Sequence, residues 1–197
     1  MKMKITVLLL ACVCFVRSTL GQGTMLITFE GPPFLASGTG VVATNYYEAG
    51  MSFTPVSGSF GFNRRGPPTN SLWPNNGTSF VQAALGESMM FSFTNGSTFN
   101  LFSVDLAGYS SVVPDVTAQF VGYRADGSIV TTSVPRNGIT FETYFFGKEF
   151  SNLTRVEIPD FGSLDNLVVS VPEPNALTLC LIGTVCGVVK LRGLRGS

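Results

Sequence analysis

The fold is decided by the stretch Val121-Gly122-Tyr123-Arg124-Ala125-Asp126-Gly127-Ser128-Ile129-Val130. Asp126-Gly127 supplies the positive φ of a tight hairpin turn, and residues that favour strands stand on both sides of it. Further along, Arg155-Val156-Glu157-Ile158 alternates, which puts Val156 and Ile158 on one face of a strand. The stretch therefore predicts an antiparallel hairpin, and its surroundings predict more strands of the same kind.

Short runs rich in Val, Ile, Thr, Phe and Tyr recur between Met25 and Val171, separated by Gly, Pro, Asn and Ser. No stretch in this region carries a helical period. The segment 55–74 is rich in Gly, Pro, Asn and Arg, so we expect a long surface loop there. The pattern predicts an all-β domain, a two-sheet β-sandwich of jelly-roll or carbohydrate-binding-module type. We expect its strands at 25–29, 50–53, 79–84, 89–93, 99–106, 116–123, 129–134, 140–145, 155–158 and 164–171.

The composition excludes several kinds of chemistry. The four cysteines are Cys12, Cys14, Cys180 and Cys186, all in the apolar segments at the two ends. The domain at 22–170 therefore has neither a disulfide nor a cysteine metal site. Histidine is absent from the chain, which removes the commonest general base and transition-metal ligand. Acidic residues outnumber basic ones in 22–170, so nucleic-acid binding is not expected.

Residues 1–21 have the pattern of a secretory signal peptide. Lys2 and Lys4 precede an apolar core at 5–16, and small residues follow, with cleavage expected after Gly21. An uncleaved anchor helix is one alternative, although its apolar core is short for spanning a bilayer. A lipoprotein signal that makes Cys12 the lipidated first residue is the other. The sequence predicts export, with the domain at 22–170 outside the cytoplasm.

The last segment combines a proline motif, an apolar run and a basic tip. Val171, Pro172, Glu173 and Pro174 form the motif, an expected transmembrane helix follows at about 175–191, and the tip at 190–197 contains Lys190, Arg192 and Arg195. The prolines keep the motif extended, and the positive-inside rule keeps the basic tip cytoplasmic. A buried core helix is the alternative, but it leaves the terminal charges unexplained.

Residues 171–197 resemble the PEP-CTERM sorting signal of Gram-negative bacteria, in which Pro-Glu-Pro precedes one hydrophobic helix and a basic tip. The resemblance is confined to this tail. It implies recognition by an exosortase-type processing enzyme, attachment to the membrane through the C-terminal helix, and an association with extracellular polysaccharide. The protein is then membrane-anchored with its domain outside, or lies at the cell surface after processing.

Two carboxylates are candidate ligands of a structural calcium ion. Glu30 closes the first expected strand and Asp165 lies in the last. First and last strands often pair in a sandwich, so the two acids are expected to converge on one rim, as in many extracellular β-sandwiches. Oxygen ligands suit Ca²⁺. The alternative is that Glu30 is solvated and Asp165 caps a turn.

Four aromatic residues, Tyr46, Tyr47, Trp73 and Tyr109, are candidates for a platform on which a sugar ring stacks. Packing in the core or in loops is the alternative for each of them. Trp73, the only tryptophan, is the strongest candidate because it lies in the expected long loop. We therefore expect a non-catalytic surface or matrix protein that binds polysaccharide.

The alternative function is an extracellular polysaccharide hydrolase. Glycoside hydrolysis requires two carboxyl groups at a suitable separation. Glu142, Glu149 and Glu157 are candidates for such a pair. Nothing in the sequence shows that any two of them converge.

Overall fold

The computed structural model describes residues 23–31, 40–43, 45–57, 60–64, 72–83, 88–113, 117–160 and 162–171. The predicted signal peptide at 1–21 and the sorting tail from Pro172 onward, with their expected helices, lie outside the described residues. Among the residues that are described, no helix is long and apolar enough to cross a membrane.

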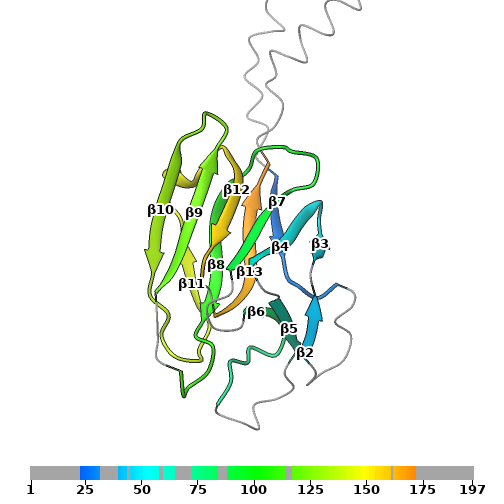
Figure 1. Cartoon of the computed structure of the whole chain (residues 1–197), viewed down its shortest axis with the longest axis vertical. Helices are drawn as coiled ribbons and strands as arrows, with labels where there is room; N and C mark the ends of the chain where they lie inside the picture. The colour runs from blue at the N-terminus through cyan, green and yellow to red at the C-terminus, as the bar shows by residue number, and fades with distance from the viewer. Residues whose placement is uncertain are drawn as a thin grey trace, which may run out of the picture. The chain divides into compact units, whose positions relative to one another are not determined.

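Two antiparallel sheets form the domain, which confirms the predicted all-β sandwich (Figure 1). The first sheet has the order β11-β8-β13-β6-β5-β2, and β1 also pairs with β13. The second has the order β10-β9-β12-β7-β4-β3. The strands of the first sheet are β1 (Thr24–Ile27), β2 (Gly40–Ala43), β5 (Phe60–Arg64), β6 (Ser79–Ala83), β8 (Asn100–Ala107), β11 (Glu142–Phe145) and β13 (Ser163–Ser170). Those of the second are β3 (Tyr46–Glu48), β4 (Met51–Ser57), β7 (Ser88–Phe93), β9 (Ala118–Arg124), β10 (Ile129–Val134) and β12 (Leu153–Ile158).

Each of the ten predicted strands overlaps a strand of the structure, but the prediction of a long loop at 55–74 is wrong. β4 continues through Pro55 to Ser57, and β5 lies wholly inside the segment. Pro55 is accommodated beside an irregularity in the β4–β7 register, where prolines are tolerated. β5 carries glycine and asparagine, which indicate a loop when read locally. It forms because it pairs with β2 on one side and β6 on the other.

The predicted hairpin is confirmed. β9 and β10 pair antiparallel with Tyr123 opposite Ile129, and the Ser128 carbonyl accepts a 2.9 Å bond from the Arg124 amide. Gly127 has φ 83°, the left-handed conformation that glycine adopts without strain.

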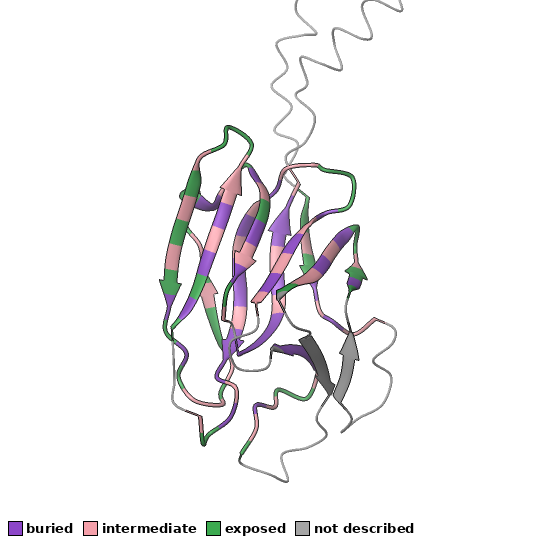
Figure 2. Cartoon of the chain, in the orientation of Figure 1, coloured by how far each residue is buried: buried purple, intermediate pink, exposed green. Residues whose placement is uncertain are grey.

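The core lies between the sheets and follows the alternation of the strands. In β7, for example, Met89, Phe91 and Phe93 are buried while the residues between them are partly exposed, a pattern visible as colour bands in Figure 2. Val156 and Ile158 of β12 are both buried, as their spacing predicts. The largest fully buried side chains are Phe29, Phe53, Phe80, Phe91, Phe99, Phe120, Phe150, Ile27 and Met51. Phenylalanine therefore supplies seven of the nine largest fully buried side chains of the sandwich.

β13 has the position that matters most for the site. Along one side it pairs with β8, while along the other it pairs first with β6 through Ser163 and Leu164, and then with β1 from Leu167. The first and last strands thus lie together, as predicted. Between these two partners lie Asp165 and Asn166, where the β8 register is also irregular and Asn166 has φ 47°. The strand therefore carries a buried polar position where one partner ends and the next begins.

Candidate functional site

Two of the four predicted aromatic residues meet. Trp73, in the loop before β6, and Tyr109, just after β8, have ring centroids 5.5 Å apart and nearly perpendicular planes. Both side chains are partly exposed. Leu72 and Val112, their loop neighbours, are 42% and 74% exposed. We call Leu72, Trp73, Tyr109 and Val112 the aromatic patch. Loops of this region lie at the lower end of the domain in Figure 1.

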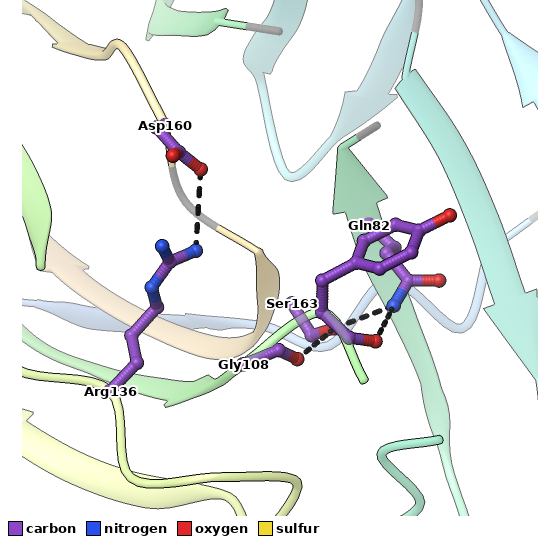
Figure 3. Close-up of polar contacts among 6 residues, drawn as sticks. Gln82, Gly108, Arg136, Asp160 and Ser163 are labelled. Atoms are coloured by element: carbon purple, nitrogen blue, oxygen red, sulfur yellow. Dashed lines mark hydrogen bonds and ion pairs between the residues drawn. The ribbon is translucent and has the colours of Figure 1, made fainter. Parts of the chain in front are cut away.

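The backbone at Tyr109 is held in place by hydrogen bonds between uncharged groups. Gln82, on β6, donates from Nε2 to the Tyr109 carbonyl at 2.9 Å and to Ser163 Oγ at 3.0 Å. Ser163, the first residue of β13, donates in turn to the Gly108 carbonyl at 3.1 Å. Figure 3 shows these groups converging. Gln82 and Ser163 are buried, so their hydrogen bonds are shielded from competing water.

A buried cation lies close to the same strand start. Arg136 is only 4% exposed and pairs with Asp160 at 3.3 Å (Figure 3). Gly162 has φ 68°, and a Cβ at this position would meet the Arg136 guanidinium and lie 2.8 Å from the Ala107 carbonyl oxygen. Glycine is therefore required where the chain enters β13.

The Trp73 side of the patch is fixed by a carboxyl group. Asp165 Oδ2 accepts a 2.6 Å bond from Asn76 Nδ2 and lies 2.8 Å from Thr78 Oγ1, while Oδ1 accepts from the Asn166 amide at 2.8 Å. Asp165 is fully buried. Burial raises its pKa to about 6, and the hydrogen bonds from Asn76 and Thr78 oppose this shift. At the other end of the loop, the Leu72 carbonyl accepts from the Ser111 amide at 2.9 Å.

Glu30 and Asp165 reach one segment, but their surroundings give the calcium hypothesis no support. Glu30 accepts from the Ser79 amide at 2.6 Å, one residue beyond Thr78. Calcium needs six or more oxygen ligands, whereas both carboxylates accept hydrogen bonds from N–H and O–H groups. Among the described residues, no three acids, cysteines or histidines are grouped as metal ligands would be. Calcium binding stays a prediction that only an ion titration can test.

The other two predicted aromatic residues lie elsewhere. Tyr46 is buried in the core against Phe29 and Phe53, and its hydroxyl donates to Glu48 at 2.7 Å. Burial, reinforced by Glu48, raises its pKa far above the usual range. Tyr47 points the other way on β3 and is 64% exposed. Tyr46 is thus part of the core, and Tyr47 is an exposed tyrosine outside the aromatic patch.

The three candidate acids of a hydrolase are held separately. Glu142 accepts from Asn137 Nδ2, and Glu157 accepts from the Tyr123 hydroxyl and pairs with Arg155. Glu149 lines an open pocket of about 430 Å³ with charged residues of both signs, among them Arg124, Asp126 and Lys148. No hydrogen bond or ion pair between described residues joins any two of the three glutamates. The paired carboxyls of a glycosidase lie about 5 to 10 Å apart and do not bond to each other, so the alternative function stays a prediction.

Sequence reasoning missed the residues that hold the aromatic patch in place. Gln82, Ser163, Asn76 and Thr78 are common polar residues, and their roles depend on which strands adjoin β13. The stretch Asn75-Asn76-Gly77-Thr78 did carry a local signal for a tight turn. The structure shows this turn: Asn75 Oδ1 accepts from the Gly77 amide and Asn76 Oδ1 from the Thr78 amide.

Comparison of the chain with protein-family models finds no match, and comparison with curated proteins finds none either.

Proposed function

We propose that the chain is an exported surface or extracellular-matrix protein whose β-sandwich binds polysaccharide through the aromatic patch and does not catalyse a reaction. The observation that carries this proposal is the meeting of Trp73 and Tyr109. They are 36 positions apart in the sequence, are partly exposed, and are flanked by two exposed apolar residues. Aromatic rings with a polar edge suit the apolar face of a sugar ring.

The hydrogen bonds that hold the two loops of the aromatic patch favour a role in ligand binding over exposure without a function. Both loops are anchored to β13 by hydrogen bonds of buried side chains, so the two loops are held before any ligand arrives. A preorganised site loses less side-chain and loop entropy on binding. The finer fold that we propose, a jelly-roll related to carbohydrate-binding modules, also presents loops at the ends of a rigid sandwich.

The terminal segments supply the proposed location. A signal peptide at 1–21 would export the domain, and the PEP-CTERM-like tail at 171–197 would hold it at the membrane or pass it to an exosortase. Export would bring the aromatic patch into contact with extracellular polysaccharide, the partner that the tail implies. Anchoring and binding are therefore complementary parts of the proposal.

The test is polysaccharide binding by the full chain in a nonionic detergent. The probes are a panel of soluble neutral and acidic polysaccharides, including β-glucans and bacterial exopolysaccharide. Trp73 is the only tryptophan, so its fluorescence reports occupancy of the patch directly. We expect at least one polysaccharide to change the Trp73 emission, and we expect Trp73→Ala to lose binding to it in an affinity gel.

The matched control is Tyr47→Ala, which removes an exposed aromatic ring outside the patch. This variant is expected to bind like the wild-type chain. Binding that survives Trp73→Ala, or the absence of binding to every polysaccharide of the panel, would contradict the proposal.

A further inference from the structure

Three side-chain oxygens beside the aromatic patch, those of Asn76, Thr78 and Asp165, lie within hydrogen-bond distance of one another in a chain with Thr78 in the middle. Thr78 Oγ1 lies 2.7 Å from Asn76 Oδ1 and 2.8 Å from Asp165 Oδ2. Both distances are those of O–H···O hydrogen bonds, so each contact needs a hydrogen. The Thr78 hydroxyl carries one hydrogen, and an ionised carboxylate carries none. With Asp165 ionised, the two contacts therefore share a single hydrogen, and each becomes a full hydrogen bond only if another group supplies a second one.

The orientation of the Asn76 amide cannot supply the missing proton. The Thr78 backbone N–H donates to Asn76 Oδ1, which fixes that atom as the carbonyl oxygen and directs Nδ2 towards Asp165. A flipped amide would place an N–H group against the Thr78 N–H. A protonated Asp165 supplies it: its Oδ2–H donates to Thr78, and the Thr78 hydroxyl donates to Asn76. When Asp165 is ionised, the Thr78 hydroxyl donates to it instead, which opposes the rise in pKa. The hydrogen bonds thus fit a protonated carboxyl.

The charges around Asp165 favour the same state. Asp105 lies directly opposite on β8, and Glu30 reaches the Ser79 amide from the chain that follows β1. β6 and the segment 72–78 contribute no ionisable side chain. No lysine or arginine among the described residues pairs with Asp165. Burial raises the pKa of Asp165 to about 6, and the charge of Asp105 adds to the shift.

The residues that Asp165 holds are continuous with Trp73. Asn76 is three positions after Trp73, and Pro74 between them is buried. The turn formed by Asn75, Asn76 and Gly77 is stiffened by its own side-chain bonds, with Gly77 at φ 86°. A change in the anchoring of this turn is therefore transmitted to the backbone next to Trp73.

We propose that Asp165 is a proton-controlled positioning residue whose protonated carboxyl docks the Asn76–Thr78 turn and so sets the position of Trp73. Loss of the proton leaves a single hydrogen for the two contacts that Thr78 makes with Asn76 and Asp165. The oxygens then repel one another, and the turn loosens. Acidic conditions then hold the patch in its assembled form, and neutral or basic conditions release the Trp73 loop. The consequence for polysaccharide binding rests on the proposed function, whereas the positioning of Trp73 does not.

The chain offers a clean readout. It has one tryptophan and no histidine, so a transition of Trp73 near neutral pH has no histidine as its source. We would titrate the full chain in nonionic detergent between about pH 4 and 8 and measure quenching of Trp73 by acrylamide, a neutral quencher. We expect one step in quenching with a midpoint near pH 6, towards greater accessibility at higher pH.

Two aspartate-to-asparagine variants separate Asp165 from other acids. Asp165→Asn is expected to lose the step, because its side chain does not titrate. Asp126→Asn removes an exposed carboxylate in the β9–β10 turn and is expected to keep the step unchanged. A wild-type chain with no step, or a step that persists in Asp165→Asn, would overturn the proposal.

A second pair of measurements applies even if Asp165→Asn does not fold. Infrared spectra of the wild-type chain should retain a protonated carboxyl band at about pH 5.5, where ordinary carboxyls are ionised, and should lose it as pH rises. Thr78→Val removes the bridging hydroxyl with little change in shape and should reduce the step in quenching. Absence of the band, or an undiminished step in Thr78→Val, would contradict the positioning role. Neither measurement involves polysaccharide, so they separate this proposal from the proposed function.

Discussion

The two loops that meet in the aromatic patch are anchored to the same strand by different chemistry. The Tyr109 loop is held through Gln82 and Ser163, which carry no charge at any accessible pH. The Trp73 loop is held through Asp165, a fully buried carboxyl. Neutral hydrogen bonds stabilise a loop equally over the whole pH range, whereas a buried acid couples its loop to proton concentration. The anchoring of the Tyr109 loop is therefore expected to be independent of pH, and the anchoring of the Trp73 loop to depend on pH.

The largest expected effect comes from a change at the start of β13, the strand to which both loops are anchored. Gly162→Ala puts a Cβ against the Ala107 carbonyl oxygen at a residue with φ 68°, at the start of β13. We expect a loss of about 2 to 4 kcal/mol in the free energy of unfolding, measured by urea denaturation. Gly127→Ala, which meets no neighbour but has a similar φ, is the control for strain alone. An equal loss in both variants would show that the packing at Gly162 contributes nothing.

Asp165→Asn tests the pH-dependent anchoring of the Trp73 loop. The folded pKa of about 6 lies above the unfolded value of about 3.9, so the folded state binds the proton more tightly. This contribution to stability is fully present below about pH 4 and is lost as pH rises through about 6. It corresponds to about 2 to 3 kcal/mol. We expect the wild-type chain to lose this amount between about pH 4 and 7, relative to Asp165→Asn. Parallel stability curves for the two proteins would refute the assignment.

Ser163→Ala tests the pH-independent anchoring of the Tyr109 loop. It leaves the buried Gly108 carbonyl without its side-chain donor and removes one of the acceptors of Gln82. We expect a loss of about 1 kcal/mol that is the same at pH 5 and at pH 7 in urea denaturation. The Trp73 quenching step should keep its midpoint. A shift of that midpoint would show that the two anchors are coupled.

Asp105→Asn sharpens the account of Asp165. Asp105 lies opposite Asp165, and its negative charge helps to raise the pKa of that carboxyl. Removal of the charge should therefore move the midpoint of the Trp73 quenching step to lower pH without abolishing the step. The Asp126→Asn variant again serves as the control. A midpoint that rises, or does not move, would mean that the two acids do not interact as described.

The smallest expected effect is that of calcium. Because N–H and O–H groups contact Asp165 and Glu30, we expect neither excess Ca²⁺ nor a chelator to change the thermal midpoint of the full chain. A rise with Ca²⁺ that disappears in Asp165→Ala would restore the calcium hypothesis and displace the proton-controlled anchor.

The strands differ in how strongly the local sequence predicts them. Strands such as β7, β9 and β12 were predictable because alternation and an Asp-Gly turn are local signals. β2, β3 and β5 were missed, since β5 has glycine and asparagine in it and forms through its two neighbours. A strand of this kind depends on pairing between distant segments, which local sequence does not encode.

The contacts of the site likewise join segments that are distant in the sequence. Trp73 and Tyr109 could be singled out as aromatic residues in turn-rich segments. Their contact, however, depends on the loop before β6 meeting the loop after β8, two strands that β13 separates in the sheet. Tyr46 looked equivalent in the sequence, but its ring packs in the core against Phe29 and Phe53, and Glu48 accepts the hydrogen of its hydroxyl group. Asp165 was identified as an acid in the last strand, yet its partners Asn76 and Thr78 are almost ninety positions away.

The most direct test of the whole account is the pH dependence of polysaccharide affinity in the full chain, compared between the wild type and Asp165→Asn. The probe is a polysaccharide that changes the Trp73 fluorescence in the panel described above. We predict that the wild-type affinity falls as pH rises through about 6 and that the affinity of Asp165→Asn does not change over this range. A wild-type affinity that is independent of pH, or that survives Trp73→Ala, would contradict the account.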